Sequence, residues 1–338
     1  MAERKKPQVH PIDEAWLALG AEEPLLPDLE LVDSHIHLWD FSDPPYYADD
    51  YAADASSAGV SASIYVDCTM AYRDHGPVAM EPVGEVEFAR AQGEACQSAV
   101  DVAAAIVGWA DLRLGDAVDP VLEALEGAGG GRLRAVRCRA NYDPDPNAGY
   151  GAIGASADLM SLADFRRGVA RVEARGLVLD LYAFHTQLAE VAELAGAFPQ
   201  LPIVLNQIGG PLGVGPYALI REQVFAKWSA GLSAVAKCPN VWLKVGGFAI
   251  SRLAIVDARG LDRPPSSAEV ADLCRPWVEH CLAEFGAGRC MFGSNFPVDK
   301  VAMPLLTLVN AMKRLTAHLP AAEQQQFFAG NARQVYRI

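Results

Sequence analysis

The sequence predicts an α/β protein whose main part is a (β/α)8 (TIM) barrel, and three observations support this class. Eight short apolar runs follow one another along the chain, and helical patterns separate them. Most of these runs are continuous rather than alternating, which is typical of parallel strands covered on both faces. A chain of 338 residues, 51% of them hydrophobic, is also long enough to bury one large core.

The predicted elements alternate in chain order. The expected strands span residues 30–38, 61–67, 103–110, 134–139, 177–184, 202–206, 241–246 and 289–294. Helical patterns include residues 84–100, 116–127, 157–175, 187–197, 217–237, 267–285 and 304–318. Turn residues mark several boundaries: Gly176 precedes one strand, Pro202 begins another, and Pro239 ends a helix. We therefore expect a barrel over residues 31–338, preceded by a proline-punctuated extension over residues 1–30 that lies on the outside.

An open, doubly wound sheet is the alternative fold. Its dinucleotide-binding version requires a Gly-x-Gly-x-x-Gly turn after the first strand, and no such turn occurs there. The glycines at 129–131 precede a strand rather than open a helix, and the glycine-rich residues 209–216 form a loop after the sixth strand. The barrel is therefore the better interpretation.

Composition limits the partners. The formal charge of −14 and a pI near 4.9 argue against nucleic acid or an anionic membrane as a partner. The seven cysteines are scattered without a Cys-x-x-Cys pair, so neither a disulfide framework nor a zinc ribbon is expected. No signal segment or membrane-spanning run is evident, and we expect a cytoplasmic protein with a small-molecule substrate. The sequence is compatible with a homo-oligomer.

His35 and His37 are the most informative residues. They end the first predicted strand two positions apart, so both imidazoles should face the same side. Two neutral imidazoles at one point make half of a divalent-metal site. The same spacing also arises when histidines orient a substrate or pack in a core, and the pattern alone leaves these alternatives open.

Polar residues also end almost all of the remaining strands. The active sites of such barrels form at the C-terminal ends of the strands. Arg137 is a candidate anchor for a substrate carboxylate, because its planar fork binds one bidentately, or it forms a salt bridge to a barrel-end aspartate. Lys244 either faces the pocket or forms an interior ion pair. Further candidates are Asp33, Asp67, Trp109, Asp111, Cys138, Arg139, His185, Gln187, Asn206, Gln207, Ser294, Asn295 and Asp299.

Four stretches together resemble the amidohydrolase superfamily. They are VDSHIHLW, IVGWADL, VLNQIGGP and MFGSNFPVD, at residues 32–39, 106–112, 204–211 and 291–299. The most similar branch is the amidohydrolase 2 group, which includes sugar-acid and pyrone-dicarboxylate lactonases, and the resemblance runs from about Trp16 to Tyr336. It implies a distorted barrel and hydrolysis of a C–O or C–N bond, with or without Zn²⁺. Some related groups instead decarboxylate aromatic acids or hydrate double bonds.

The resemblance assigns active-site roles to several residues of this sequence, and at other positions the sequence differs from the family pattern. His35 and His37 match the metal pair of the first strand, and His185 matches a fifth-strand histidine that could complete a three-histidine face. Gln207 stands where relatives commonly carry a histidine, and Asn295 where many carry an aspartate that takes a proton from water. Trp109 and Cys138 occupy places where we would expect histidines, and Asp67 a place where we would expect glutamate.

These departures change the expected chemistry. Asn295 cannot accept a proton from water at neutral pH, so another base is needed. Asp299 qualifies if its loop turns inward, and Asp33 and Asp67 are alternatives. The thiol of Cys138 lacks a histidine partner and is expected to be inert. His75, in the loop after the second strand, could reach the substrate or simply lie in a loop.

The leading hypothesis is a hydrolase that opens a lactone or related cyclic ester of a small carboxylated molecule. His35, His37 and His185 would hold Zn²⁺, Arg137 the carboxylate, and Asn295 and Gln207 the oxyanion, while an aspartate moves protons. At positions 109, 138, 207 and 295 the chain lacks the ionisable or metal-binding residues that we would expect from its relatives. These replacements also fit a metal-free lyase, decarboxylase or cyclase with His35 or His37 as acid or base. A third hypothesis is a small-molecule binding protein without catalytic activity.

Overall fold

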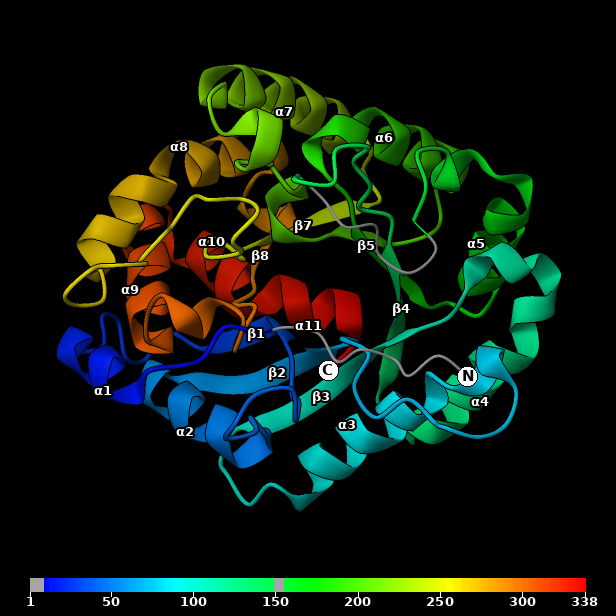
Figure 1. Cartoon of the computed structure of the whole chain (residues 1–338), viewed down its shortest axis with the longest axis horizontal. Helices are drawn as coiled ribbons and strands as arrows, with labels where there is room; N and C mark the ends of the chain where they lie inside the picture. The colour runs from blue at the N-terminus through cyan, green and yellow to red at the C-terminus, as the bar shows by residue number, and fades with distance from the viewer. Residues whose placement is uncertain (1–8, 149–154) are drawn as a thin grey trace.

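Eight parallel strands form one nearly closed barrel in the computed structural model, which describes residues 9–148 and 155–338 (Figure 1). Each strand pairs with the next in the chain, in the order β1 to β8. A single bridge between Ile36 and Phe296 joins the two ends of the sheet. The strands are β1 (Leu31–Ile36), β2 (Val60–Val66), β3 (Asp101–Trp109), β4 (Leu133–Arg139), β5 (Val178–Tyr182), β6 (Ile203–Leu205), β7 (Val241–Val245) and β8 (Cys290–Phe292). The predicted fold class is confirmed.

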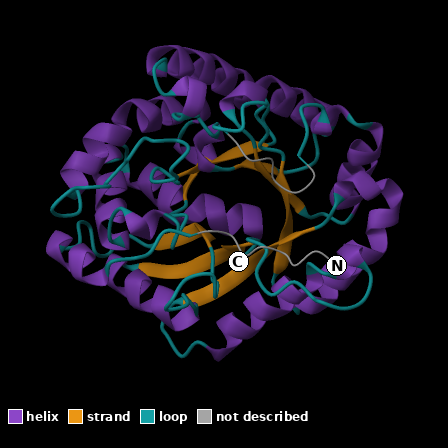
Figure 2. Cartoon of the chain, viewed as in Figure 1, coloured by secondary structure: helices purple, strands orange, loops and turns teal. Residues whose placement is uncertain are grey.

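Most helices cover the outside of this ring of strands, whereas the last one lies across an end of the barrel (Figure 2). They are α1 (Glu14–Leu17), α2 (Ala48–Ala58), α3 (Val83–Ala95), α4 (Asp119–Gly129), α5 (Ala163–Ala174), α6 (Leu188–Ala197), α7 (Arg221–Ala236), α8 (Ser267–Phe285), α9 (Leu305–Leu315), α10 (Ala321–Gln325) and α11 (Asn331–Tyr336). Their ends follow local chemistry. The hydroxyl of Ser266 and the carboxylate of Glu269 form a capping box at the start of α8. Gly59 ends α2 with a φ of 78°, a left-handed conformation that glycine adopts without strain.

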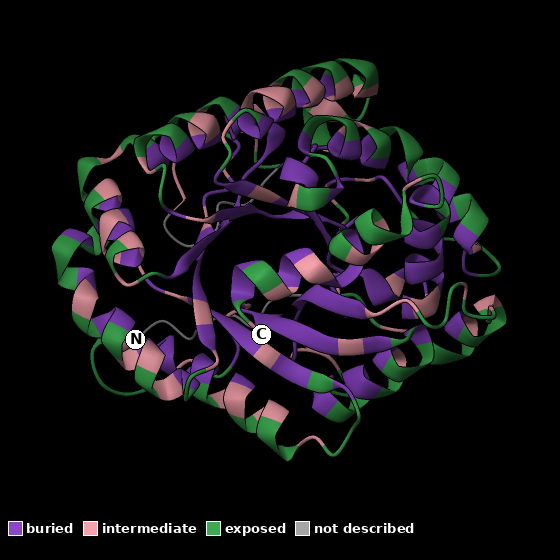
Figure 3. Cartoon of the chain, turned by 180° about the vertical axis from the view of Figure 1, so that it is seen from behind, coloured by how far each residue is buried: buried purple, intermediate pink, exposed green. Residues whose placement is uncertain are grey.

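The interior of the barrel is a packed core rather than a pore. Inward-facing aliphatic residues of the strands pack against α11, whose Val335 and Tyr336 are buried. Seen from behind, this last helix lies across the barrel (Figure 3). The N-terminal end of the barrel is thus filled by the C-terminus of the chain, which leaves the opposite end for chemistry.

Residues 14–30 are attached along the outside of α8 and α9. The carboxylate of Glu22 accepts hydrogen bonds from the Ser267 backbone N–H, at 2.6 Å, and from Asn310 Nδ2, at 2.9 Å. Lys313 Nζ donates to the carbonyl oxygen of Leu25 at 2.7 Å. Within residues 9–148 and 155–338, no helix is long and apolar enough to cross a membrane.

Candidate active site

His35 and His37 meet at the C-terminal end of β1. The pairing of β1 with β2 is irregular between Asp33 and Ile36. Both rings turn to one side, as the spacing predicts, and their Nε2 atoms lie 3.3 Å apart. His37 Nδ1 lies 2.7 Å from the carbonyl oxygen of Val66. Since a carbonyl only accepts, Nδ1 carries the proton and His37 Nε2 presents a lone pair to the site.

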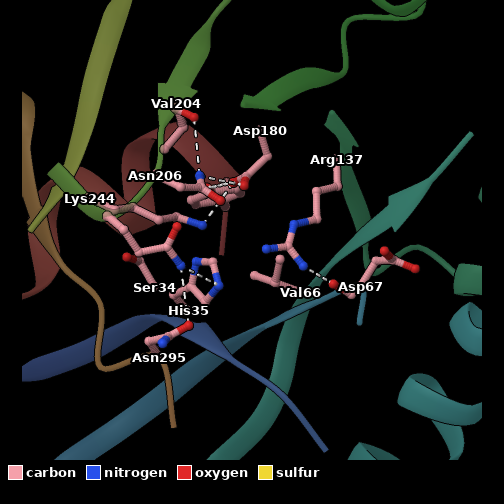
Figure 4. A network of polar contacts seen from close by, with 12 residues as sticks. Ser34, His35, Val66, Asp67, Arg137, Asp180, Val204, Asn206, Lys244 and Asn295 are labelled. Atoms are coloured by element: carbon pink, nitrogen blue, oxygen red, sulfur yellow. Dashed lines mark hydrogen bonds and ion pairs between the residues drawn. The ribbon is translucent and has the colours of Figure 1, made fainter. Parts of the chain in front are cut away.

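Two amide side chains continue this cluster. Gln207 Nε2 lies 3.2 Å from His35 Nε2 and donates to Asn295 Oδ1, also at 3.2 Å. Asn295 Nδ2 in turn donates to Asp299 Oδ1 at 2.8 Å, so Asp299 is turned inward (Figure 4 shows His35 and Asn295). Gln207 and Asn295 both have left-handed backbones, with φ of 41° and 62°, which aim their side chains back over the barrel. The ends of β1, β6 and β8 thus build one polar cluster.

The contacts of His35 Nε2 belong to two different tautomers. Donation from Gln207 Nε2 requires a lone pair on His35 Nε2, with the proton on Nδ1. Donation from His35 to the lone pair of His37 requires the proton on Nε2. The two contacts of His35 Nε2 are therefore not both hydrogen bonds in any one neutral tautomer of His35.

Burial sets the charge of the cluster. It lowers the pKa of His37 to about 3 and that of His35 well below its usual value, and the positive charges of Arg137 and Lys244 act in the same direction. Burial raises the pKa of Asp299 to about 7, against the hydrogen bonds from Ala249 N–H and Asn295. At neutral pH both imidazoles are uncharged, and Asp299 is near its midpoint.

Cations lie on the β4 side of the cluster. Arg137 is buried and its guanidinium donates to the carbonyl oxygen of Asp67 (Figure 4). Its Nε has no hydrogen-bond partner among the residues that the structure describes. The aspartate ion pair considered for Arg137 is made by Arg139, whose Nη2 lies 3.1 Å from Asp67 Oδ1. Arg139 also lies over the Trp109 ring, 5.9 Å from its centre.

Lys244 forms the interior ion pair, the second of the two alternatives that its sequence left open. Its Nζ lies 2.8 Å from Asp180 Oδ2, and both side chains are fully buried (Figure 4). Tyr336 donates to the same oxygen at 2.5 Å, and Asn206 Nδ2 donates to Asp180 Oδ1 at 2.7 Å. One N–H of Lys244 is therefore bound to Asp180, and its positive charge helps to lower the pKa of His35.

Three predicted residues lie elsewhere. His185 Nδ1 accepts from the Leu212 N–H at 3.3 Å, and its ring packs edge-on against Tyr217. His75 lies at the surface, where its side chain is 83% exposed and pairs with Asp74, and its contact with a substrate stays a prediction. Burial raises the pKa of the Cys138 thiol to about 12, in agreement with an inert cysteine.

Asp33 was considered as a base, but both of its carboxylate oxygens accept hydrogen bonds that join β1 to neighbouring segments. Its Oδ1 accepts from the Ser294 N–H at 2.8 Å, and its Oδ2 accepts from the Tyr51 hydroxyl at 3.1 Å. The sequence analysis did not identify Glu85, whose carboxyl group accepts from the Tyr65 hydroxyl and the Cys68 N–H, both at 2.7 Å. Burial and the charge of Asp67 raise the pKa of Glu85 well above its usual value. No motif of the sequence points to that residue.

His35 and His37 are spaced like zinc ligands, but the described residues do not bring a third ligand to them. The 3.3 Å between the two Nε2 atoms suits adjacent ligands of a tetrahedral zinc, for which bonds of about 2.0–2.1 Å give about 3.3–3.4 Å. However, no group of three His, Cys, Asp or Glu side chains that could hold a metal occurs within residues 9–148 and 155–338. Gln207 also turns its NH2 group, which is a donor, toward His35 Nε2 and Asn295 Oδ1. Zinc at His35, His37 and His185 therefore stays a prediction.

Fold and site together define a barrel enzyme, and comparison with known proteins gives its family. The Amidohydrolase family model matches residues 32–338, so the chain belongs to the amidohydrolase family and is an enzyme of that superfamily. An L-fucono-1,5-lactonase of Burkholderia multivorans is 28% identical over 333 residues, covering 91% of this chain and 96% of that protein. The uncharacterized protein y4mH of Sinorhizobium fredii is also 28% identical, covering 92% of this chain and 99% of that protein. A crystal structure of a Burkholderia multivorans amidohydrolase with bound zinc has a TM-score of 0.68 and 25% identity, covering 91% of this chain and 99% of that one.

Proposed function

We propose that the protein hydrolyses a lactone, or a related cyclic ester, of a small carboxylated molecule. The observation that carries this proposal is the contact series from His35 through Gln207 and Asn295 to Asp299. It combines neutral imidazoles with amide donors in an enclosed barrel end, which suits attack of water on a carbonyl group. The lactonase name of a relative that aligns with nearly the whole chain supports the same reaction.

His37 is the proposed base. Its Nδ1–H is held by the carbonyl oxygen of Val66, so its Nε2 lone pair points into the site. Burial lowers the pKa of His37 to about 3, so its lone pair carries no proton at neutral pH but is a weak base until a negative charge develops beside it. His37 takes a proton from water as the water oxygen bonds to the lactone carbonyl carbon. When the ring C–O bond breaks, the same proton returns to the alkoxide oxygen.

Amide groups stabilise the charge that develops. An N–H of Gln207 that now points to His35 can turn to the carbonyl oxygen as that atom becomes negative. Asn295 holds the Gln207 amide, and Asp299 holds Asn295, so Asp299 is proposed as a positioning residue. Arg137 is proposed to bind the substrate carboxylate: its Nε–H is buried without a partner, and the side chains that cover it must move to admit the substrate. No step of this reaction passes through a metal.

The test is a screen of five- and six-membered lactone carboxylates by proton release and by NMR of the product. We expect ring-opened hydroxy acids from the wild type and a loss of about 100-fold or more in kcat/KM for His37→Gln. The same change at the exposed His318 is the matched control. Loss of CO2, or a cyclised or dehydrated product, would establish the lyase hypothesis instead. Saturable binding without any product would establish a binding protein.

Zinc is tested on the same enzyme. The predicted three-histidine site requires about one zinc per chain and a lactonase activity that chelation abolishes. The Gln207 contacts lead to the opposite expectation, that a chelator leaves turnover unchanged. Metal analysis before and after dialysis against EDTA, with kcat/KM measured on both samples, separates the two.

A further inference from the structure

Glu85 is a buried carboxyl group without a part in the proposed mechanism. It lies on α3, the helix that follows β2, and it contacts the loop between them. Its Oε1 accepts from the Cys68 N–H at 2.7 Å, and its Oε2 accepts from the Thr69 N–H at 3.0 Å. The Tyr65 hydroxyl also donates to Oε1, at 2.7 Å. Glu85 thus ties α3 to the two residues that directly follow Asp67.

The segment held by Glu85, residues 67–72, has a strained backbone, and we call it the β2 turn. Thr69 is left-handed with a φ of 72°, which is rare for a β-branched residue. Ala71 is also left-handed, with a φ of 49°. The first turn of α3 lies close against it, because a Cβ on Gly84 would collide with the carbonyl oxygen of Ala71. Such strain persists only where the surrounding groups hold it, and it is common at ligand sites.

The β2 turn sets the direction of the Asp67 carboxylate. The turn returns to Asp67 at its far end, where the Tyr72 hydroxyl donates to Asp67 Oδ2 at 2.9 Å. Asp67 Oδ1 lies 3.1 Å from Arg139 Nη2; neither atom has a hydrogen-bond partner among the described residues, so this contact is an ion pair only. Arg137 donates instead to the backbone carbonyl oxygen of Asp67. The negative charge of Asp67 is therefore directed to Arg139 rather than to Arg137.

The charges of the two acids agree with this arrangement. Burial and the charge of Asp67 raise the pKa of Glu85, so Glu85 is protonated at neutral pH and does not compete for an arginine. Burial opposes ionisation of Asp67, but the charge of Arg139 and the other contacts outweigh it and lower the pKa of Asp67. Asp67 is thus the charged member of the pair. If its carboxylate were free to turn, it would pair with Arg137, which already contacts its backbone.

We propose that Glu85 is a positioning residue that keeps Arg137 available to the substrate carboxylate. By holding the β2 turn, Glu85 directs the Asp67 carboxylate to Arg139 and away from Arg137. This inference rests on the carboxylate role proposed for Arg137 and deepens it. The preference for a negatively charged substrate then depends on a residue of α3 as well as on the arginine that binds the charge.

The test compares a charged and an uncharged ligand by isothermal titration, without turnover. The ligands are a tetrahydropyran carboxylate and its carboxamide, which keep the ring and the substituent of a lactone substrate but lack the ring carbonyl group that reacts. We expect the wild type to bind the carboxylate about tenfold or more tightly than the amide, because hydrogen bonds to an ionised group are stronger. The ratio of the two dissociation constants does not depend on how much of a variant is folded.

Glu85→Leu removes the acceptors of the Cys68 and Thr69 N–H groups and should reduce the carboxylate preference to about threefold or less. Glu94→Leu makes the same change at an exposed position of the same helix and should keep the wild-type ratio. Glu85→Gln keeps one oxygen acceptor and should give an intermediate ratio. It also serves as the test variant if Glu85→Leu does not fold.

A double variant separates the direction of the charge from general damage. Asp67→Asn, added to Glu85→Leu, removes the carboxylate that would neutralise Arg137 and should restore most of the carboxylate preference. A merely structural role of Glu85 predicts no restoration, because a second buried change only adds to the damage. An unchanged ratio in Glu85→Leu, or a double variant without restoration, would overturn the inference.

The two proposals fail in different ways. A wild type that hydrolyses no lactone overturns the proposed function, whereas the titrations still report whether Glu85 controls the carboxylate preference. A wild type that hydrolyses lactone carboxylates while Glu85→Leu keeps its ratio overturns the role of Glu85 alone. Equal binding of the two ligands by the wild type overturns the role of Glu85 together with the anchor proposed at Arg137.

Discussion

Two buried polar clusters lie inside this barrel, and they differ in how completely their acid and base groups are satisfied. In the cluster around Asp180, both carboxylate oxygens have partners, supplied by Lys244, Tyr336 and Asn206, although Asn206 Oδ1 itself has none among the described residues. In the cluster at the β1 end, His35 Nδ1 and Gln207 Oε1 have no partner among the residues that could be described. Unsatisfied buried polar atoms are costly, so the first cluster has the character of structure and the second that of a ligand site.

The largest expected effect is on stability, at the satisfied cluster. Asp180→Ala leaves the buried ammonium of Lys244 unpaired, which should lower the free energy of unfolding by about 3–5 kcal/mol. Urea unfolding measures this loss. Asp272→Ala breaks an exposed ion pair with Arg275 and should cost at most about 1 kcal/mol.

A rescue variant sharpens this result. Asp180→Leu combined with Lys244→Met removes both charges and should recover much of the lost stability. If the double variant is no more stable than Asp180→Ala, the loss does not come from an unpaired charge. The Asp180 cluster would then have to be explained by packing.

The next effect is on activity, at the unsatisfied cluster. Gln207→Leu removes the amide proposed to stabilise the oxyanion and should lower kcat by about 100-fold. The unfolding midpoint should stay near the wild-type value, because this amide is incompletely bonded in the unliganded protein. If Gln207→Leu instead greatly lowered stability while its folded fraction kept a normal kcat, Gln207 would have a structural role. The two clusters would then not differ as described.

The sequence predicted the barrel and most of this second cluster. Continuous apolar runs located the eight strands, and strand alternation placed His35 and His37 on one side. Helix α2 was missed because its buried face consists of four alanines and one tyrosine, which are weakly hydrophobic. The resemblance placed His185 with His35 and His37, but its observed contacts are with Leu212 and Tyr217, which lie in a later segment that the sequence pattern does not position.

The Asp180 cluster shows another limit of the sequence. Asp180 and Lys244 are each a lone charge within a buried strand, and a lone buried charge requires a partner. That rule predicts pairing, but it does not say which residues pair. The hydroxyl of Tyr336 completes the cluster from the last helix, 156 positions away. Only the closed barrel brings the three side chains together.

The last effect is on the pH dependence of stability, through Asp299, and it is spread over about three pH units. Burial raises its pKa from the model-peptide value of 3.8 to about 7, so between those values the folded protein binds a proton that the unfolded chain does not. Stability should therefore fall as the pH rises from about 4 to 7, by at most about 1.4 kcal/mol per pH unit from this group, and should not change further above that range. Asp299→Asn cannot ionise and should remove this contribution.

The measurement is the difference between wild type and Asp299→Asn in urea unfolding at several pH values from 4.5 to 8. Asp28→Asn, at an exposed position of the extension, should keep the wild-type slope. Parallel curves for wild type and Asp299→Asn would mean that the carboxyl group is ionised throughout, with its charge compensated by Asn295 and the Ala249 N–H. In that case Asp299 would be a paired charge with a structural role, like Asp180. Gln207 would remain part of the candidate ligand site.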